Sequence, residues 1–469
     1  MSTPSTREQL DALSRDDLIG LVLQLQQRLA QLEARLNQSS KNSGKPPSQD
    51  SPFQPMAPRT KQLKTVRKSG GQPGHEGAGL SKVETPDHIV LHRPDTCARC
   101  GYDLSQEISV PAGTWQVFDL PHDLTLMVTQ HQRHEVTCPW CRQESRAALP
   151  GWLVQETPCQ YGPRCRALGV YLMGQQHLPF ARTQAVFVDL FGSAPSQGTL
   201  WRWQQQAHQC LAPVEAAIAQ ALITSAIAGA DETPVRAVTG LSWIHVLCNT
   251  VWTWYGAHAK RGREAMEAFG LLPRFTQQGG VLMSDCLASY AIYGGTRALL
   301  CNAHAHLLRE LRAVEEAGHG WARGMARLLV SVKERVESAG APLARSALLS
   351  VWRWFGRCLA QAERENATSF VDRSSCLLSR LRVRRDEYLR FASVAGVWFD
   401  NNVSERALRM VKLHQKVSGC FRSRLGAEVL CRVRGYLSTM KKQGQDLFPA
   451  LVSVMEGRPL LPPLLAQNN

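Results

Sequence analysis

The strongest indication of the fold class is WIHVLCNTVWTWY, residues 243–255. Two runs rich in β-branched and aromatic residues flank Asn249-Thr250, a pattern typical of a β-hairpin. Upstream, residues 226–230 predict a strand that ends at Asp231. These three segments predict three consecutive antiparallel strands.

Downstream, a helix near residues 263–269 precedes an apolar strand, residues 279–284, which ends at Asp285. Residues 298–301 form a fifth apolar run. Residues 305–390 show helical periodicity, and a further helix is expected from Asn402 to about residue 416. The pattern predicts an α/β (α+β) mixed sheet with a helical insertion.

Three carboxylates stand out in this framework, namely Asp231, Asp285 and Glu405. Carboxylates at neighbouring strand ends, joined by one from a packed helix, would make an all-oxygen site for Mg²⁺, or Mn²⁺ in its place. Each also has a structural alternative. Asp231 could start a turn, Asp285 could cap a helix, and Glu405 could complete a capping box with Asn402.

The charge distribution favours a polyanionic partner. Lys plus Arg outnumber Asp plus Glu by 54 to 39, which gives a net charge of +15 and a pI near 9.4. Residues 401–442 hold ten Lys/Arg against two Glu. The candidate phosphate contacts after Glu405 are Arg406, Arg409, Lys412, Lys416 and Arg422. A merely basic protein remains the alternative.

No run of about 20 apolar residues and no signal peptide is evident, so a cytoplasmic, nucleoid-associated location is expected.

Two CxxC pairs, Cys97/Cys100 and Cys138/Cys141, could supply four thiolates to a structural Zn²⁺. Apolar alternation between the pairs, at residues 115–128, predicts connecting strands. Reduced thiols without metal and a redox dithiol are the alternatives, and His131 and His134 are competing ligands.

Residues 162–210 predict three helices, at about 163–176, 181–191 and 196–209. The second and third are joined by a Gly-containing turn, as in a helix-turn-helix, which would place Gln197, Thr199 and Arg202 near the reading end. A three-helix bundle that does not bind DNA has the same spacing.

The N-terminal segment begins with Ser14 and Asp17, which suit a helix start. Leucine and valine then recur in steps of four and three from Leu18 to Leu36, as in a two-stranded coiled coil that would make the protein a homo-oligomer. A helix packed on its own chain is the alternative. Residues 39–85 read as a flexible basic linker, with Gly70-Gly71-Gln72-Pro73-Gly74-His75 as a cluster of breakers.

Several of these stretches together resemble the insertion-sequence-66 family of bacterial transposases, over nearly the whole length. They are the leucine coil with residues 38–48, residues 70–75, the two CxxC pairs, Tyr161-Gly162, Asp231-Glu232-Thr233, Ser284-Asp285 with Tyr290, Cys301 with His304, residues 400–406 and residues 416–423. The resemblance implies a ribonuclease-H-like catalytic domain with an Asp-Asp-Glu triad at Asp231, Asp285 and Glu405. Cys301 and His304 match a Cys-x-x-His signature of several related transposases. Two roles are open for this pair, which could bind zinc or could only pack and order the site. Relatives often have adjacent basic residues directly after His304, whereas this chain has Ala305-His306.

The resulting domain prediction has six parts. They are a coiled-coil helix at 1–38, a basic linker at 39–85, a zinc-binding domain at 86–150, a helix-turn-helix-like domain at 151–215, a ribonuclease-H-like catalytic domain at 220–442 with an insertion at about 312–396, and a tail at 443–469. The predicted function is Mg²⁺-dependent cleavage and strand transfer on double-stranded DNA, with helper proteins of the same element as possible partners. A catalytically silent DNA-binding protein and a structure-specific nuclease are the rival hypotheses.

Overall fold

The computed structural model describes residues 14–36, 82–110, 114–121, 124–238, 240–285, 288–293, 299–302, 304–366 and 373–466. The chain divides into two compact units, residues 51–128 and the remainder, and each is described by itself. None of the helices in the described ranges is long and apolar enough to cross a membrane.

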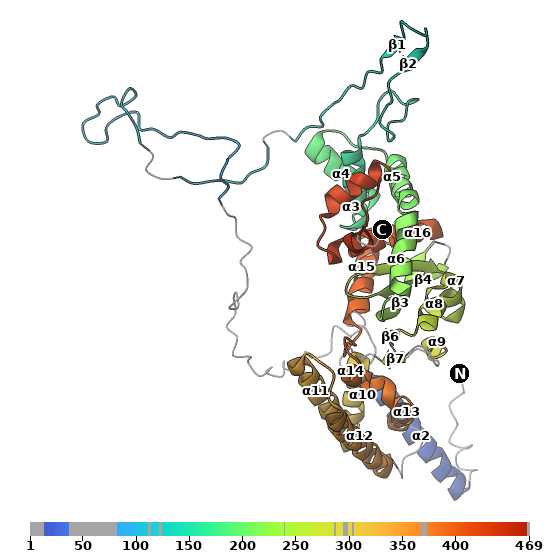
Figure 1. The fold of residues 1–469 in the computed structure, drawn as a ribbon. Helices are drawn as coiled ribbons and strands as arrows, with labels where there is room; N and C mark the ends of the chain where they lie inside the picture. The colour runs from blue at the N-terminus through green and yellow to red at the C-terminus, as the bar shows by residue number, and fades with distance from the viewer. Residues whose placement is uncertain are drawn as a thin grey trace. The chain divides into compact units, whose positions relative to one another are not determined.

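A five-stranded mixed sheet forms the centre of the larger unit (Figure 1). Its strands are β3 (Ile227–Ala237), β4 (Gly240–Cys248), β5 (Thr253–His258), β6 (Val281–Ser284) and β7 (Leu299–Asn302), in the order β5-β4-β3-β6-β7. The first three are antiparallel, whereas β6 pairs parallel to both β3 and β7. The predicted mixed sheet is therefore confirmed, including the β4–β5 hairpin across Asn249-Thr250.

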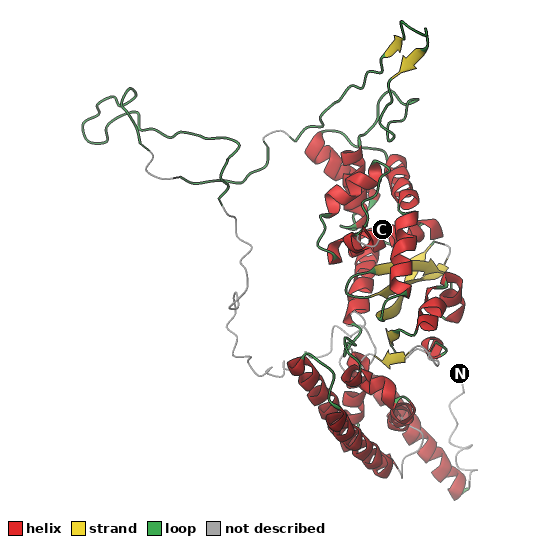
Figure 2. Ribbon diagram, viewed as in Figure 1, coloured by secondary structure: helices red, strands yellow, loops and turns green. Residues whose placement is uncertain are grey.

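Helices cover both faces of this sheet (Figure 2). Ala228 and Ala230 of β3 belong to a core shared with α6 (Ala212–Ile223) and α8 (Leu271–Gln278). The opposite face packs against α15 (Asn402–Ser418) and α16 (Arg424–Lys442). Because successive strand residues point to opposite faces, each residue of β3 is assigned to one of these two layers by its position. Two short helices, α7 (Arg263–Phe269) and α9 (Ala288–Ala291), flank strand ends.

The helical region before the sheet contains α3 (Pro163–Gly174), α4 (Phe180–Phe191) and α5 (Gln197–Cys210). These three helices agree with the prediction to within a few residues. The predicted tail is different, because it contains α17 (Leu447–Met455), which packs on α3 and α5 with Leu451 and Val454 fully buried. A last short helix, α18, spans Pro463–Ala466.

The insertion between β7 and α15 is a separate helical layer with its own core. Its helices are α10 (His304–Glu316), α11 (Gly320–Ala339), α12 (Arg345–Asn366), α13 (Arg373–Val383) and α14 (Arg385–Ser393). Trp321, Phe355 and Tyr388 are fully buried in that core, and Val281 and Met283 of β6 join it. The insertion is therefore anchored on the strand that leads to Asp285.

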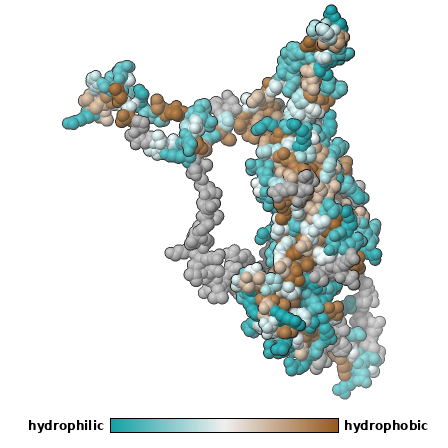
Figure 3. Space-filling model, viewed as in Figure 1, coloured by the Kyte–Doolittle hydropathy of each residue, from teal (hydrophilic) through white to brown (hydrophobic). Residues whose placement is uncertain are grey.

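The strands predicted between the two CxxC pairs are absent from the described part of residues 114–128. Trp115 and Val117 are more than four-fifths exposed, and Figure 3 shows apolar residues at the surface of this segment. Alternation predicts a strand only where a second strand supplies hydrogen bonds, and none does here among the described residues. The strands that do form are β1 (Glu135–Thr137) and β2 (Glu144–Arg146), an antiparallel pair around the second CxxC.

The N-terminal helix α2 spans Arg15–Leu36. Ser14 Oγ accepts the Asp17 N–H at 3.2 Å and donates to its carboxylate at 2.6 Å, so the predicted start is confirmed. Val22, Leu25 and Leu29 are 51%, 56% and 60% exposed. The coiled-coil seam thus remains a prediction, and residues 37–81 lie outside the described residues.

Candidate active site

Strands β3 and β6 bring Asp231 and Asp285 together. Their parallel pairing runs from Ile227↔Val281 to Gly229↔Met283, and both carboxylates follow directly beyond it. Asp285 immediately follows β6, as predicted. Asp231 does not end its strand, because β3 continues to Ala237 with β4 as its partner. The alternative that Asp231 starts a turn is therefore wrong.

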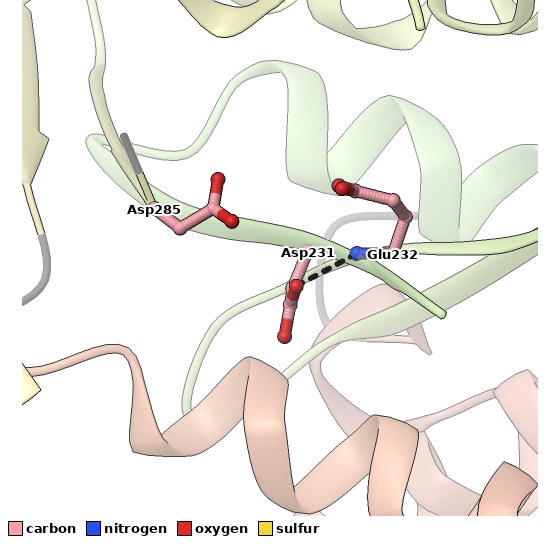
Figure 4. A group of neighbouring side chains, drawn as sticks. All are labelled: Asp231, Glu232 and Asp285. Carbon is pink, nitrogen blue, oxygen red and sulfur yellow. Dashed lines mark hydrogen bonds between the residues drawn. The ribbon is translucent and has the colours of Figure 1, made fainter. Parts of the chain in front are cut away.

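The carboxylates of Asp231, Glu232 and Asp285 form one cluster (Figure 4), in which ligand oxygens of all three lie within 4.8 Å of one another. Asp231 and Glu232 point to opposite sides of β3, and Asp231 is directed toward α15. The N–H of Glu232 donates to Asp231 Oδ1 at 2.8 Å. Such a set of hard oxygen donors suits a divalent cation.

Burial and neighbouring negative charge raise the pKa of Asp231 to about 8. Burial contributes most, followed by the charge of Glu232, while Asp285 and Glu405 also raise this pKa. These carboxylates carry like charges that repel one another, and their oxygens converge on a small volume. A bound cation fits such a site because it would relieve the repulsion.

Glu232 has a different environment from the two aspartates. Its side chain is fully buried and both oxygens are hydrogen-bonded. Tyr290 donates its hydroxyl to Oε2 at 2.5 Å, and Arg261 contacts Oε1 through Nε at 2.9 Å and a terminal nitrogen at 2.8 Å. Burial raises the pKa of Glu232, and the contacts with Tyr290 and Arg261 lower it.

Helix α15 carries Glu405 to the same region. Asn401 precedes the helix and donates its amide to Ala230 O at 2.9 Å, which fixes the helix start beside Asp231. Gly229 permits this approach, because a Cβ there would lie 2.5 Å from both Asn401 Oδ1 and Ser404 Oγ. Asn401, not Asn402, is the N-cap and its side chain makes no capping bond, so the capping-box alternative for Glu405 is wrong.

The side chain next to Glu405 belongs to α10. His306 Nε2 lies 3.8 Å from Glu405 Oε1, and an arginine, Arg309, contacts the same imidazole. His306 therefore lies beside the third carboxylate. The side chains of Cys301 and His304 lie outside the described residues.

The basic side chains of α15 separate into two groups. Arg406, Arg409 and Lys416 are exposed, as is Arg422 beyond the helix. Lys412 instead donates to Pro234 O at 2.6 Å, and burial lowers its pKa. Lys412 is therefore engaged in holding α15 to β3 rather than projecting freely toward a partner.

Helix α5 presents the residues predicted to read DNA. Ser196 caps the helix by accepting the Thr199 N–H at 3.1 Å, and the two hydroxyls lie 3.0 Å apart. Gln197 and Arg202 are exposed. Gln197 also lines a cavity of about 570 Å³ between α5 and the α15–α16 connection.

The two CxxC pairs adopt the same local turn. In each, the first cysteine accepts at its carbonyl the N–H four residues on, from Gly101 or Arg142, at 2.9 Å. Those two residues both have positive φ, 74° and 64°. Backbone N–H groups within each turn lower the pKa of Cys97 and Cys138, Cys100 and Cys141 being the largest contributors. Each pair thus has the shape of a two-thiolate half-site. His131 packs edge-on against Trp152.

Sequence reasoning missed three residues of this site. Glu232 and Tyr290 were noted only as parts of larger motifs, and Arg261 was not noted at all. The run Lys260-Arg261-Gly262-Arg263, a basic turn directly after a predicted strand, was the available signal.

Clustered carboxylates at adjoining strands, beside a helix with exposed arginines, are typical of enzymes that process nucleic acids with hard cations. A match to a family model supports a DNA-processing enzyme in general. The model of the IS66 transposase family matches residues 158–429, more than half of the chain, and the chain therefore belongs to that family. A second model, of a family of unknown function (DUF6444), matches residues 5–81. No curated protein matches the chain.

Proposed function

We propose that this chain is a DNA transposase that cleaves DNA at the ends of an insertion sequence and joins the freed 3′-hydroxyls to target DNA. One observation carries the proposal within the family. Asp231 and Asp285 converge at the β3–β6 junction, and α15 brings Glu405 close enough for its charge to raise the pKa of Asp231. The three carboxylates are the proposed triad.

The sheet supports a ribonuclease-H-like reading of the catalytic domain. Three antiparallel strands are followed by two parallel ones in the sheet. The middle strand, β3, carries Asp231, and its parallel neighbour, β6, leads to Asp285. The helix with the third carboxylate packs on the middle strand. On this reading, the helical insertion from α10 to α14 separates the second and third members of the triad in sequence while keeping them together in space.

Asp231, Asp285 and Glu405 would hold Mg²⁺, which when bound stabilises negative charge on the attacking and leaving oxygens of a phosphoryl transfer. The chain itself positions these groups. Asn401 and Lys412 fix α15 against β3, and His306 contacts Glu405 from α10. Arg406, Arg409 and Lys416 are exposed on the same helix and supply cations for the DNA backbone.

Three further proposals concern DNA contacts, a structural metal and self-association. The helix-turn-helix-like pair α4–α5 contacts DNA through Gln197 and Arg202. Cys97, Cys100, Cys138 and Cys141 share one structural Zn²⁺, which their two matched turns support. The seam of α2 joins two copies, because synapsis of two element ends requires more than one active site.

The test is a strand-transfer assay with the full chain, Mg²⁺ and DNA from the boundary of the element that encodes it. We expect cleaved ends and joined products, both absent from an Asp231→Asn variant that still binds the same DNA. Cleavage without joining would instead indicate a structure-specific nuclease. Binding without either reaction would indicate a silent DNA-binding protein, and both of these outcomes contradict the proposal.

A further inference from the structure

A short basic loop, Ala259–Gly262, connects β5 to α7 at the edge of the carboxylate cluster. Its backbone is held at Lys260, whose N–H donates to His258 Nδ1 at 3.0 Å. The carbonyl of Lys260 lies 3.2 Å from Nε2 of His245, which is buried. Gly262 fits closely beside α9, since a Cβ there would come within 3.0 Å of Ser289 Oγ. The loop therefore has a defined position beside α9.

Arg261 is the member of this loop that turns toward the cluster. Its guanidinium contacts Glu232 Oε1 and lies 5.0 Å from the centre of the Trp243 ring. The side chain is still 44% exposed. Two contacts to one oxygen leave other N–H groups of the guanidinium for a further acceptor, and no other hydrogen-bond or ion-pair partner occurs among the described residues. The arginine is held on one side and open on the other.

Arg263, two residues on, has a different arrangement. Its Nε contacts Glu267 Oε1 at 2.6 Å across one turn of α7, and both side chains are about half exposed or more. The same contact raises the pKa of Arg263. It is a surface ion pair of the ordinary kind. The chain thus offers two neighbouring arginines, of which only Arg261 is bonded to the buried carboxylate of the cluster.

We propose that Arg261 binds a phosphate of the DNA strand that lies at the carboxylate site, and that Glu232 is the positioning residue that aims it. This rests on the proposed function, since it assigns a substrate contact to that site. A polyanion must approach at least three other carboxylates, so a fixed cation beside them offsets the repulsion. A guanidinium suits the task because its planar donors match two phosphate oxygens.

Glu232 belongs to the cluster by distance, yet its hydrogen bonds assign it a different role from the aspartates. Oε1 is taken by Arg261 and Oε2 by Tyr290, whereas Asp231 accepts only a backbone N–H among the bonds that the structure shows. A carboxylate anchored at both oxygens holds its partners in place. Glu232 therefore orients Arg261 and Tyr290.

The first experiment measures the salt dependence of binding to a short random-sequence duplex, for the full-length wild type and for Arg261→Ala and Arg263→Ala. Loss of one phosphate contact reduces the slope of log K against log salt by about 0.9. We expect that reduction for Arg261→Ala alone, with Arg263→Ala retaining the wild-type slope. Equal slopes for all three proteins would overturn the assignment of Arg261. If the wild type itself binds no duplex, the proposed function fails with it.

The second experiment tests the positioning role of Glu232 by strand transfer. Glu232→Gln keeps the shape of the side chain but removes its ion pair with Arg261. Arg261 should therefore still contribute its charge, while its guanidinium is less firmly oriented toward the phosphate. We expect an unchanged salt slope, a strand-transfer rate lowered about tenfold because the phosphate is less well positioned, and the wild-type Mg²⁺ concentration for half-maximal rate. A much higher Mg²⁺ requirement would make Glu232 a metal ligand and overturn its positioning role. Arg261→Lys keeps the charge but not the planar guanidinium. If it restores the salt slope that Arg261→Ala loses, but not the strand-transfer rate, the planar donor geometry is confirmed as the feature that matters.

Discussion

The proposed carboxylate triad and the cysteine turns are two candidate metal sites built in opposite ways. Asp231, Asp285 and Glu405 come from two strands and a helix, separated by 54 and 120 positions, and the sheet and α15 bring them into one region. Each CxxC instead closes its own turn through hydrogen bonds within six residues. The first arrangement depends on tertiary packing and the second on local geometry.

The difference shows where each site is vulnerable. A carboxylate cluster with mutual repulsion requires a rigid scaffold, and β3 provides one because layers pack on both of its faces. The cysteine turns have little apolar burial around them, so a metal would have to supply much of their stability. Substitutions should therefore affect activity at the first site and local folding at the second.

The largest effect is expected from Glu405→Gln. The change removes one charge from the proposed metal site, so strand transfer should fall by roughly 100-fold or more. DNA binding should hold or tighten slightly, because a negative charge near the phosphates is lost. Gel-shift and joining assays on the same preparation measure both, and circular dichroism checks that the helices persist. Full joining activity would transfer the third role to Asp400, the nearest carboxylate before Glu405 in the sequence.

Gly229→Ala tests whether the scaffold sets the spacing of the triad. The added Cβ would meet Asn401 Oδ1 and Ser404 Oγ at 2.5 Å, so α15 must shift away from β3. We expect a loss of about 1–3 kcal/mol in unfolding free energy and a roughly tenfold slower strand transfer. Gly356→Ala in α12 is the matched control, because nothing lies within 4 Å of its Cβ. Thermal unfolding should show it stabilised by about 0.5–1 kcal/mol, and a similar response of both variants would refute the packing argument.

Cys138→Ser tests the second kind of site. One thiolate of the proposed four is lost, so zinc content should drop from about one per chain to well below it. Hydrogen exchange should accelerate in β1 and β2, which flank this turn, while the protection of β3 and β4 stays unchanged. Metal analysis and exchange mass spectrometry measure these effects. Wild-type protein that is protected at β1 and β2 but free of zinc would rule out a structural metal.

The smallest effect on the fold is expected from Leu25→Lys with Leu29→Lys. Both side chains are already more than half exposed on α2, so thermal unfolding of the chain should not change. Self-association should weaken, because lysines would enter the seam of the proposed coil. Light scattering should show a lower mass than for the wild type over the same concentrations. An unchanged mass would exclude α2 as the oligomer contact.

Local patterns predicted the elements well where their periodicity was strong. The β4–β5 hairpin, the three helices from α3 to α5 and the start of α2 at Ser14 all follow from short-range rules, and the structure confirms them. The strands predicted at residues 115–128 did not form, because alternation alone cannot supply a pairing partner. Residues 443–469 looked like a tail for a related reason. Nothing local shows that α17 buries Leu451 and Val454 against α3.

For the site, residue patterns along the chain were enough to indicate which carboxylates to consider and that the last of them begins a basic helix. They could not determine that β3 continues past Asp231, or that Asn401 rather than Asn402 caps α15. Nor could they show that Lys412 is bonded to Pro234 O and Arg261 to Glu232. These are contacts between segments 29 to 178 positions apart. They depend on how the layers pack, since side-chain partners across a fold are selected by distance in space, which periodicity along the chain does not encode.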